Sequence, residues 1–432
     1  MDELAHFLAK FLDEGISAFH VVAAIEQRLV SNGFEKLKEN EIWRLKDNHR
    51  YYVTRNGSSI VAFKTSDHEA NGFLVGASHS DSPSFKVKEN PEIVDNNYVK
   101  VNTEGYGGML CAPWLDRPLS VAGRAIVRDG KGYSTRLVNV DKDFLVIPSL
   151  AIHMNREAND GKAYNKQVDM LPIIGSLECK GMFMETVAQS LGVAKEDIVS
   201  HDLYLYVREK SRIIGACGEY VMGPHLDDLQ CCFGNMEGFL ASENQKIAVL
   251  AVFDNEEVGS LTKQGASSMF LSDTLERIAL SLGKDRQGLF AMLANSFMVS
   301  ADNSHAIHPN HPEAADPVNR PQINKGIVIK SHASQKYTTD AMSSAVFKAV
   351  CDKAGVPIQY FTNRSDKRSG STLGNLATGH VSINTLDIGL PMLAMHSCYE
   401  TAGTKDAFYL KEAMRTFFSS NLRMGEDCFT LE

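Results

Sequence analysis

The sequence has no stretch of 18 or more apolar residues, so no transmembrane helix is expected. Its start, MDELAHFLAKFLDEG, has acids where a secretory signal needs a basic segment and an apolar core, which predicts a cytoplasmic protein. It also has no basic excess, because 44 Lys and Arg against 53 Asp and Glu give a formal charge of -9. We therefore expect neither a membrane nor a nucleic acid as partner.

Several common motifs are missing. None of the eight cysteines forms a C-x-x-C pair, which argues against a structural zinc site, and scattered thiols suit a reducing compartment. There is no G-x-x-x-x-G-K-[ST] motif, and the glycine cluster at 105–108 has no strand–helix frame, so a nucleotide enzyme is poorly supported. The absence of G-x-S-x-G argues against a Ser-His-Asp hydrolase.

Hydrophobic periodicity indicates an α/β fold. Residues 1–33 are typical of two helices, and 50–64 of a hairpin. Apolar runs predict buried strands at 72–78, 247–253, 297–301 and 326–331, with helical patterns at 226–242, 273–295 and 338–354. Fully apolar strands alternating with helices predict a parallel sheet covered on both faces. Short, polar and Gly-rich strands from about 90 to 222 predict an inserted β-rich domain, so we expect domains at 1–90 plus 222–432 and at 91–221.

Polar segments follow the predicted strands, where ligands bind in open α/β sheets. They are 79–81 (HSD), 254–257 (DNEE), 302–305 (DNSH) and 395–396 (MH), and a fifth, 225–228 (HLDD), opens a helix. Each alone has an ordinary structural explanation. Glu256 and Glu257 also suit the start of a helix, and a single buried histidine such as His79 is more often a core residue.

Taken together, these segments predict a metal site. They combine two His, two or three Asp and a Glu pair, a ligand set that suits zinc or manganese. Such a set can hold two metals about 3.5–4 Å apart, a known hydrolytic device. The spare Glu of the 256–257 pair is then the candidate general base, and Asp81 is suited to orient His79.

The ordered motifs HSDSP, LDD, DNEEVG, SADNSHAIHPN, VIK with QKY, and AMHS resemble the aspartyl aminopeptidase family of two-zinc exopeptidases. The resemblance runs essentially from end to end. It implies a three-layer zinc-exopeptidase domain with a mixed, largely parallel sheet, interrupted by a β-rich dimerisation domain. It also implies a metal-dependent aminopeptidase with zinc as the usual metal, two ions per subunit, and cobalt or manganese as substitutes.

The resemblance assigns the metal ligands by position. His79 and Asp302 would hold one zinc, and Glu257 and His396 the other. Asp227 would bridge the two ions. The family pattern around the bridging residue is Arg-x-Asp-Asn, whereas this chain has an aspartate at 228, so its local field is more negative.

The resemblance also implies catalytic and substrate-binding roles. Glu256 would be the general base, Asp81 would orient His79, and His305 would stabilise the oxyanion. Lys330 and Tyr337 match family positions that contact substrate. Family members often favour N-terminal Asp or Glu, and a lysine at 330 would explain this preference by charge pairing.

His153 matches a residue that the family sends from the inserted domain into a neighbouring subunit's site. The family forms large homo-oligomers, typically tetrahedral dodecamers built from dimers. Two alternatives are a deacylase or carboxypeptidase of the same two-zinc fold and a non-catalytic assembly protein on a peptidase fold. The complete set of ligands and base argues against the assembly protein, since a catalytically dead copy should have lost one of them. Peptides blocked at the amino end distinguish the first of these from an aminopeptidase.

Overall fold

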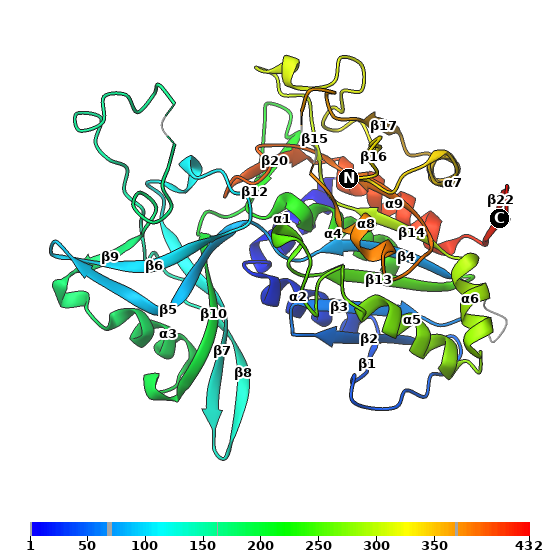
Figure 1. Cartoon of the computed structure of the whole chain (residues 1–432), viewed down its shortest axis with the longest axis horizontal. Helices are drawn as coiled ribbons and strands as arrows, with labels where there is room; N and C mark the ends of the chain where they lie inside the picture. The colour runs from blue at the N-terminus through cyan, green and yellow to red at the C-terminus, as the bar shows by residue number, and fades with distance from the viewer. Residues whose placement is uncertain (1, 67–70, 162, 368–369) are drawn as a thin grey trace. The chain divides into compact units, whose positions relative to one another are not determined.

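The computed structural model describes residues 2–66, 71–161, 163–367 and 370–432 (Figure 1). The chain divides into two compact units. The first comprises Met1–Asp81, Ser211–Met395 and Thr401–Glu432, and the second comprises Ser82–Lys210 and His396–Glu400. The second unit therefore begins at Ser82 in the structure, whereas the sequence pattern predicts a domain boundary at residue 91. Among the described residues, no helix is long and apolar enough to cross a bilayer.

A mixed, largely parallel sheet forms the middle of the first unit. Its strands, within the described residues, are β1 (Glu35–Lys36), β2 (Arg50–Arg55), β3 (Ser59–Lys64), β4 (Phe73–His79), β13 (Ile247–Phe253), β14 (Phe297–Ala301), β16 (Ile327–Lys330), β17 (Ile358–Phe361) and β18 (Asn384–Gly389). They are ordered β1-β2-β3-β13-β4-β14-β18-β16-β17. The neighbours β13, β4, β14 and β18 run parallel, so their carboxyl ends meet at one edge. β3 is antiparallel to β13, and β16 is antiparallel to β18.

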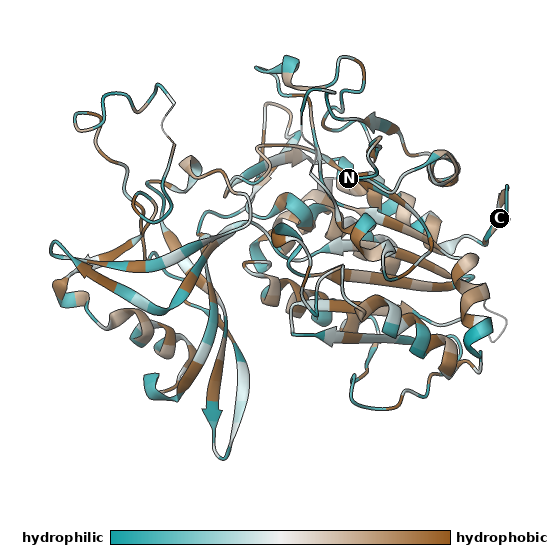
Figure 2. Cartoon of the chain, in the orientation of Figure 1, coloured by the Kyte–Doolittle hydropathy of each residue, from teal (hydrophilic) through white to brown (hydrophobic). Residues whose placement is uncertain are grey.

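Helices cover both faces of this sheet, which makes the unit three-layered (Figure 1). They are α1 (Asp2–Glu14), α2 (Ala18–Ser31), α4 (Leu226–Leu240), α5 (Phe270–Ser281), α6 (Arg286–Ala294), α7 (Ala341–Ala354), α8 (Leu373–Thr378) and α9 (Asp406–Ser419). The even-numbered residues of β13 pack with α1, α2, α4, α7 and α9, whereas its odd-numbered residues pack with α5, α6 and α8. Side chains alternate between the two faces of a strand, so a strand buried on both faces must be apolar throughout. Figure 2 shows the central strands in brown along their length.

One predicted helix is wrong in its extent. The pattern at 273–295 is divided between α5 and α6, because Gly283 adopts the left-handed backbone conformation, with a φ of +76°, just after the first helix. Asp285 then caps α6, since its side chain accepts a hydrogen bond from the backbone N–H of Gly288.

An antiparallel sheet forms the second unit. Its strands, within the described residues, are β5 (Ser84–Asp95), β6 (Tyr98–Tyr106), β7 (Leu119–Asp129), β8 (Gly132–Asn139), β9 (Ile173–Ser176) and β10 (Ile198–Val207), in the order β8-β7-β10-β5-β6-β9. Helix α3 (Met182–Leu191) packs its buried side chains into the core of this sheet. The strands of this unit lie in the middle of the chain, between residues 84 and 207.

A smaller sheet includes β15 and β19, which directly follow β14 and β18 of the large sheet along the chain. Its strands are β11 (Arg212–Ile214), β12 (Tyr220–Gly223), β20 (Glu400–Gly403), β19 (Pro391–Leu393) and β15 (Ser304–His305), in that order. β15 lies parallel to β19, with Ser304 opposite Pro391 and His305 opposite Met392. β21 (Leu422–Met424) and β22 (Phe429–Leu431) form a separate hairpin.

Candidate metal centre

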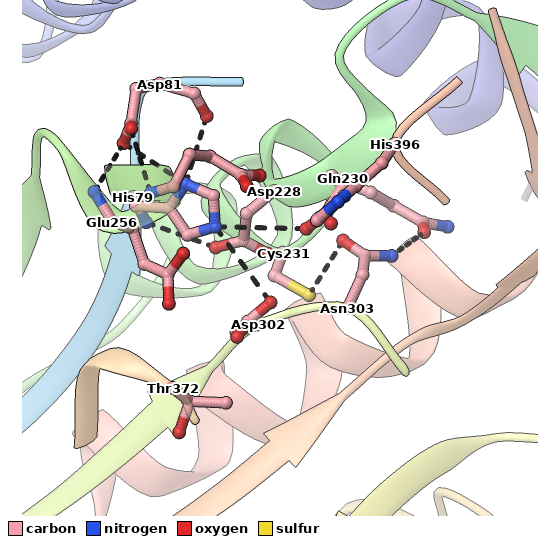
Figure 3. A network of polar contacts seen from close by, with 12 residues as sticks. His79, Asp81, Asp228, Gln230, Cys231, Glu256, Asp302, Asn303, Thr372 and His396 are labelled. Atoms are coloured by element: carbon pink, nitrogen blue, oxygen red, sulfur yellow. Dashed lines mark hydrogen bonds and ion pairs between the residues drawn. The ribbon is translucent and has the colours of Figure 1, made fainter. Parts of the chain in front are cut away.

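His79 ends β4 and is almost completely buried. Its Nδ1 lies 3.0 Å from the carbonyl oxygen of Asp81 and 3.4 Å from Oδ1 of the same residue. Its Nε2 lies 3.8 Å from Oδ1 of Asp227 and 3.9 Å from Oδ1 of Asp302. One ring nitrogen is therefore turned to Asp81, and the other faces carboxylates from two different segments (Figure 3).

Asp81 links His79 to the turn that carries both glutamates. That turn, η4 (Glu256–Val258), follows β13, the strand beside β4. Oδ1 of Asp81 accepts a hydrogen bond from the backbone N–H of Glu256 at 3.1 Å, and Oδ2 accepts one from Glu257 at 3.2 Å. His79, Glu256 and Glu257 each place a ligand atom within 4.8 Å of the others. Both carboxylate oxygens of Asp81 thus hold the glutamate turn next to the imidazole.

Asp227 and Asp228 lie at the start of α4, and both are buried. Asp227 belongs to a second group with His79 and Asp302, whose ligand atoms also lie within 4.8 Å of one another. Asp228 instead uses Oδ2 to accept a hydrogen bond from the backbone N–H of His79 at 3.1 Å. Burial raises the pKa of Asp228 well above its ordinary value; His79 opposes this rise, and the neighbouring aspartates add to it. The two adjacent acids therefore have different partners.

Asp302 follows β14 directly, and its segment is held from two sides. Nζ of Lys330 donates to the carbonyl oxygens of Asp302 at 2.7 Å and Asn303 at 3.2 Å, and lies 3.6 Å from Oδ2 of Asp302. From α4, Oε1 of Gln230 accepts a hydrogen bond from Nδ2 of Asn303 at 2.8 Å, and the Cys231 thiol donates to Oδ1 of Asn303 at 3.5 Å. These contacts fix the backbone that carries the Asp302 carboxylate, and Figure 3 shows those that Gln230 and Cys231 make with Asn303.

Negative charge dominates the cluster. Burial lowers the pKa of His79, but its hydrogen bond to Asp81 and the nearby carboxylates outweigh burial and raise that pKa well above its ordinary value. Burial raises the pKa of Glu256 to about 8, His79 opposes the rise, and neighbouring carboxylates such as that of Asp302 add to it. The raised pKa values of His79, Asp228 and Glu256 mean that the cluster favours bound protons, and it therefore attracts positive charge.

A divalent metal ion fits this site. The donors are an imidazole and carboxylates, which bind zinc at about 2.0–2.2 Å. The distances of 3.8 and 3.9 Å from Nε2 of His79 to two carboxylates are too long for hydrogen bonds and suit ligands that share one ion. The first unit offers two such groups, one with Asp227 and Asp302 and one with the glutamate pair. A cation there would balance the excess negative charge.

Residues expected to contact substrate also lie in the first unit. Tyr337 is buried, and Nζ of Lys330 lies 5.3 Å from the centroid of its ring. His305 is exposed at the end of β15, with its ring centroid 6.0 Å from that of Phe361. His305 lies three positions after Asp302 in the sequence. Lys330 contacts the same segment through its bonds to the carbonyls of Asp302 and Asn303.

Two further predicted residues belong to the second unit. His396 directly follows Met395 of the first unit; its backbone N–H donates to Oε1 of Glu400, and its Nδ1 lies 2.9 Å from the carbonyl oxygen of Gly108. An Nδ1 turned to a carbonyl leaves Nε2 as the nitrogen that can bind a metal. His153 is exposed in the segment between β8 and β9.

Asp387 was not anticipated as a site residue. It is completely buried on β18, and its carboxylate accepts hydrogen bonds from the N–H of Thr338 at 2.6 Å, from its Oγ1 at 2.7 Å, and from Oγ1 of Thr372 at 2.7 Å. These bonds hold the segment that carries Tyr337 against the sheet. The available signal was an aspartate within the otherwise uncharged strand NTLDIG.

Known proteins share this fold and much of this sequence. The family profile described as "Aminopeptidase I zinc metalloprotease (M18)" matches residues 11–418. The chain belongs to the M18 aminopeptidase family. It is therefore a metallopeptidase, a hydrolase of a family described by its zinc. A "Probable M18 family aminopeptidase 2" of Clostridium acetobutylicum is 46% identical over 427 residues, which cover 96% of this chain and 99% of the relative.

Solved structures of M18 proteins have the same fold. The structure described as "the Ape4 and Nbr1 complex" superposes with a TM-score of 0.92 at 34% identity, covering 96% of this chain and 85% of that one. The "S. cerevesiae mApe1 dodecamer" superposes with a TM-score of 0.84 at 26% identity, covering 96% of each chain. The expected family and the expected fold class, with a mixed, largely parallel sheet, are confirmed.

Proposed function

We propose that this M18 aminopeptidase removes N-terminal residues from peptides with a free amino terminus, favours Asp and Glu there, and uses two zinc ions. The observation that carries the proposal is the position of the His79 imidazole between Asp81 on one side and two carboxylates on the other. His79 and Asp302 would hold one ion, Glu257 and His396 the other, and Asp227 both. Bound zinc would supply Lewis acidity and lower the pKa of water.

The residues of the chain supply the remaining chemistry. Glu256 accepts a proton from the attacking water on its carboxylate and returns it to the nitrogen of the leaving peptide. Asp81 supports this role because its oxygens hold the backbone N–H groups of both glutamates. His305 donates a hydrogen bond to the oxyanion of the tetrahedral intermediate. The negative field of the cluster attracts the substrate's α-ammonium group.

We also propose a homo-oligomer, a tetrahedral dodecamer built from dimers, in which His153 enters the site of a neighbouring subunit. A dodecamer is known for the related S. cerevisiae protein. Support comes from apolar side chains in the same segment, since Met154 is 75% exposed and Val168 is 73% exposed. Exposed apolar side chains gathered in one segment are typical of a contact surface.

The test is the release of amino acids from a panel of peptides with free N-termini, with added zinc, cobalt or manganese and with chelator. We expect metal-dependent release that is fastest from N-terminal Asp and Glu. N-acetylated copies of the same peptides should not be cleaved. Equal cleavage of acetylated peptides would indicate a deacylase or carboxypeptidase, and no release under any metal would indicate an assembly protein.

Lys330 is the proposed determinant of the acidic preference. An ammonium has three N–H donors, and two of those of Lys330 go to the carbonyls of Asp302 and Asn303. Oδ2 of Asp302 lies 3.6 Å from Nζ, which is beyond hydrogen-bond distance, so a substrate carboxylate can take the third donor. A hydrogen bond to a charged group contributes about 1.5–3 kcal/mol. Lys330→Ala should therefore lower kcat/KM for acidic substrates by about 10- to 100-fold more than for Leu or Ala substrates.

The matched control is Lys325→Ala, because Lys325 is an exposed lysine shortly before the same strand. It should leave the ratio of acidic to neutral turnover unchanged. If Lys330→Ala lowers turnover of every substrate equally, its role is to hold the Asp302 segment and not to select the substrate.

A further inference from the structure

A cavity of about 270 Å³ opens beside His305 in the first unit. Most of its wall is apolar, with side chains from three segments of the chain. Ala306, Ala314 and Ala315 come from the segment after β15, Phe361 ends β17, and the strand β19 with its following residues supplies Met392–Met395. Polar and charged residues also line it, among them His308, Asp316 and Arg364. A pocket whose walls are mainly apolar, with polar groups at defined positions, is the usual form of a ligand subsite.

The cavity shares chain segments with the proposed catalytic centre. His305 lies three positions after Asp302, and it pairs with Met392 of β19. The chain then runs through Met395, which lines the cavity, directly into His396. The same strand ends that carry proposed metal ligands therefore also form the wall of the cavity.

The cavity is separate from the proposed position of the first substrate residue. Lys330 and Tyr337 are not among its lining residues in the described part of the chain. Phe361 lines the cavity and also lies near the Lys330–Tyr337 pair, because its ring centroid is 6.5 Å from that of Tyr337 and 6.0 Å from that of His305. His305 is the residue shared by the proposed catalytic centre and the cavity.

We infer that this cavity binds the side chain of the second residue of the peptide, the first residue after the cleaved bond, and that it selects large apolar side chains. The inference rests on the proposed aminopeptidase function. When the bond to be cleaved is held at the metal centre, the first residue of the peptide lies on one side of the centre and the second residue on the other. Because Lys330 and Tyr337 do not line the cavity but His305 does, we assign the cavity to the second residue.

Charge at the cavity also excludes one class of side chain. Its lining includes Arg364, Lys367 and His308, and Nε of Arg364 is paired with Oδ1 of Asp366 at 2.7 Å. The carboxylate of Asp316 is engaged by the backbone N–H groups of Val318 at 3.0 Å and Asn319 at 2.7 Å. A lysine at the second position would bring a further positive charge to this basic edge, so it should be a poor substrate residue.

The test uses dipeptide amides with a constant first residue and Gly, Leu, Phe or Lys second, together with the amide of the first residue alone. The single-residue amide has no second side chain and reports catalysis without the cavity. We expect kcat/KM for Leu and Phe to exceed that for Gly by about ten-fold or more, with Lys below Gly.

Ala315→Phe should fill the cavity and lower kcat/KM for the Leu and Phe peptides by about ten-fold, while hydrolysis of the single-residue amide stays unchanged. Ala314→Phe is a second narrowing variant for use if the first does not fold. Val318→Phe is the matched control, because Val318 is in the same loop, is 82% exposed and does not line the cavity.

Two results would overturn the assignment of the cavity while leaving the proposed function intact. One is wild-type cleavage with no preference for the second residue. The other is an Ala315→Phe variant whose kcat/KM falls as much for the single-residue amide as for the dipeptide amides. The second result would place the first residue in the cavity. Failure of the wild-type protein to cleave any of these substrates would overturn the proposed function together with the assignment.

Discussion

Glu256→Gln should lower kcat by about 10²- to 10⁴-fold while metal content stays unchanged. Glutamine keeps the shape of the side chain and the backbone N–H that donates to Asp81. It cannot accept a proton from water at neutral pH, so the step assigned to the carboxylate is lost. The measurement is steady-state kinetics on the best peptide of the panel, with metal content determined by elemental analysis.

Glu237→Gln is the matched control for this variant. Glu237 is a partly buried glutamate on α4 whose pKa is raised by burial, and it lies outside the metal groups of the described residues. Its substitution should leave kcat near the wild-type value. A Glu256→Gln enzyme within about ten-fold of wild type would contradict the assignment of Glu256 as the general base.

Asp227→Asn should release metal and abolish most activity, whereas Asp228→Asn should change both much less. The Asp227 carboxylate faces Nε2 of His79 and groups with Asp302, so its negative charge is expected to act directly on the metal. Asp228 accepts a backbone hydrogen bond from His79, and the carbonyl oxygen of asparagine can replace it. The loss of metal affinity for Asp227→Asn should exceed the ~10–100-fold typical of a change in an outer partner.

The experiment compares metal stoichiometry and affinity of the two variants by competition with a chelator, alongside activity. Each variant is a control for the other, since the two residues are adjacent and carry the same change. If Asp228→Asn loses metal while Asp227→Asn retains it, the bridging position belongs to Asp228. Equal loss in both would mean that the site depends on total charge and not on one bridging carboxylate.

Much of the fold follows from the sequence because its signals are local. Apolar runs such as IAVLAVF are buried on both faces of a sheet, and the helices between them place the carboxyl ends of β13, β4 and β14 at one edge. Where a local signal is weak, the prediction is less accurate. The helical pattern at 273–295 continues through Gly283, and only the left-handed backbone at that glycine reveals the break.

Partners distant in sequence were harder to foresee. Gln230 gave no sign that it binds Asn303, which is 73 positions later. Asp387 gave a partial sign, a charge within a strand, but the threonines that donate to it come from two separate segments. A side chain's hydrogen-bond partner depends on which segments the fold brings together, and no local pattern encodes that.

The sequence by itself determined the chemistry of this protein: imidazole and carboxylate groups at strand ends, in an order that identifies its family. Only the tertiary structure decided which partner each of several adjacent or similar side chains contacts. It turns Asp227 to the imidazole and Asp228 to the backbone, and it places the Lys330 ammonium against the carbonyls of Asp302 and Asn303. The physical reason is that residue type sets what a side chain can bind, whereas its direction is set by backbone dihedrals and by packing between distant segments.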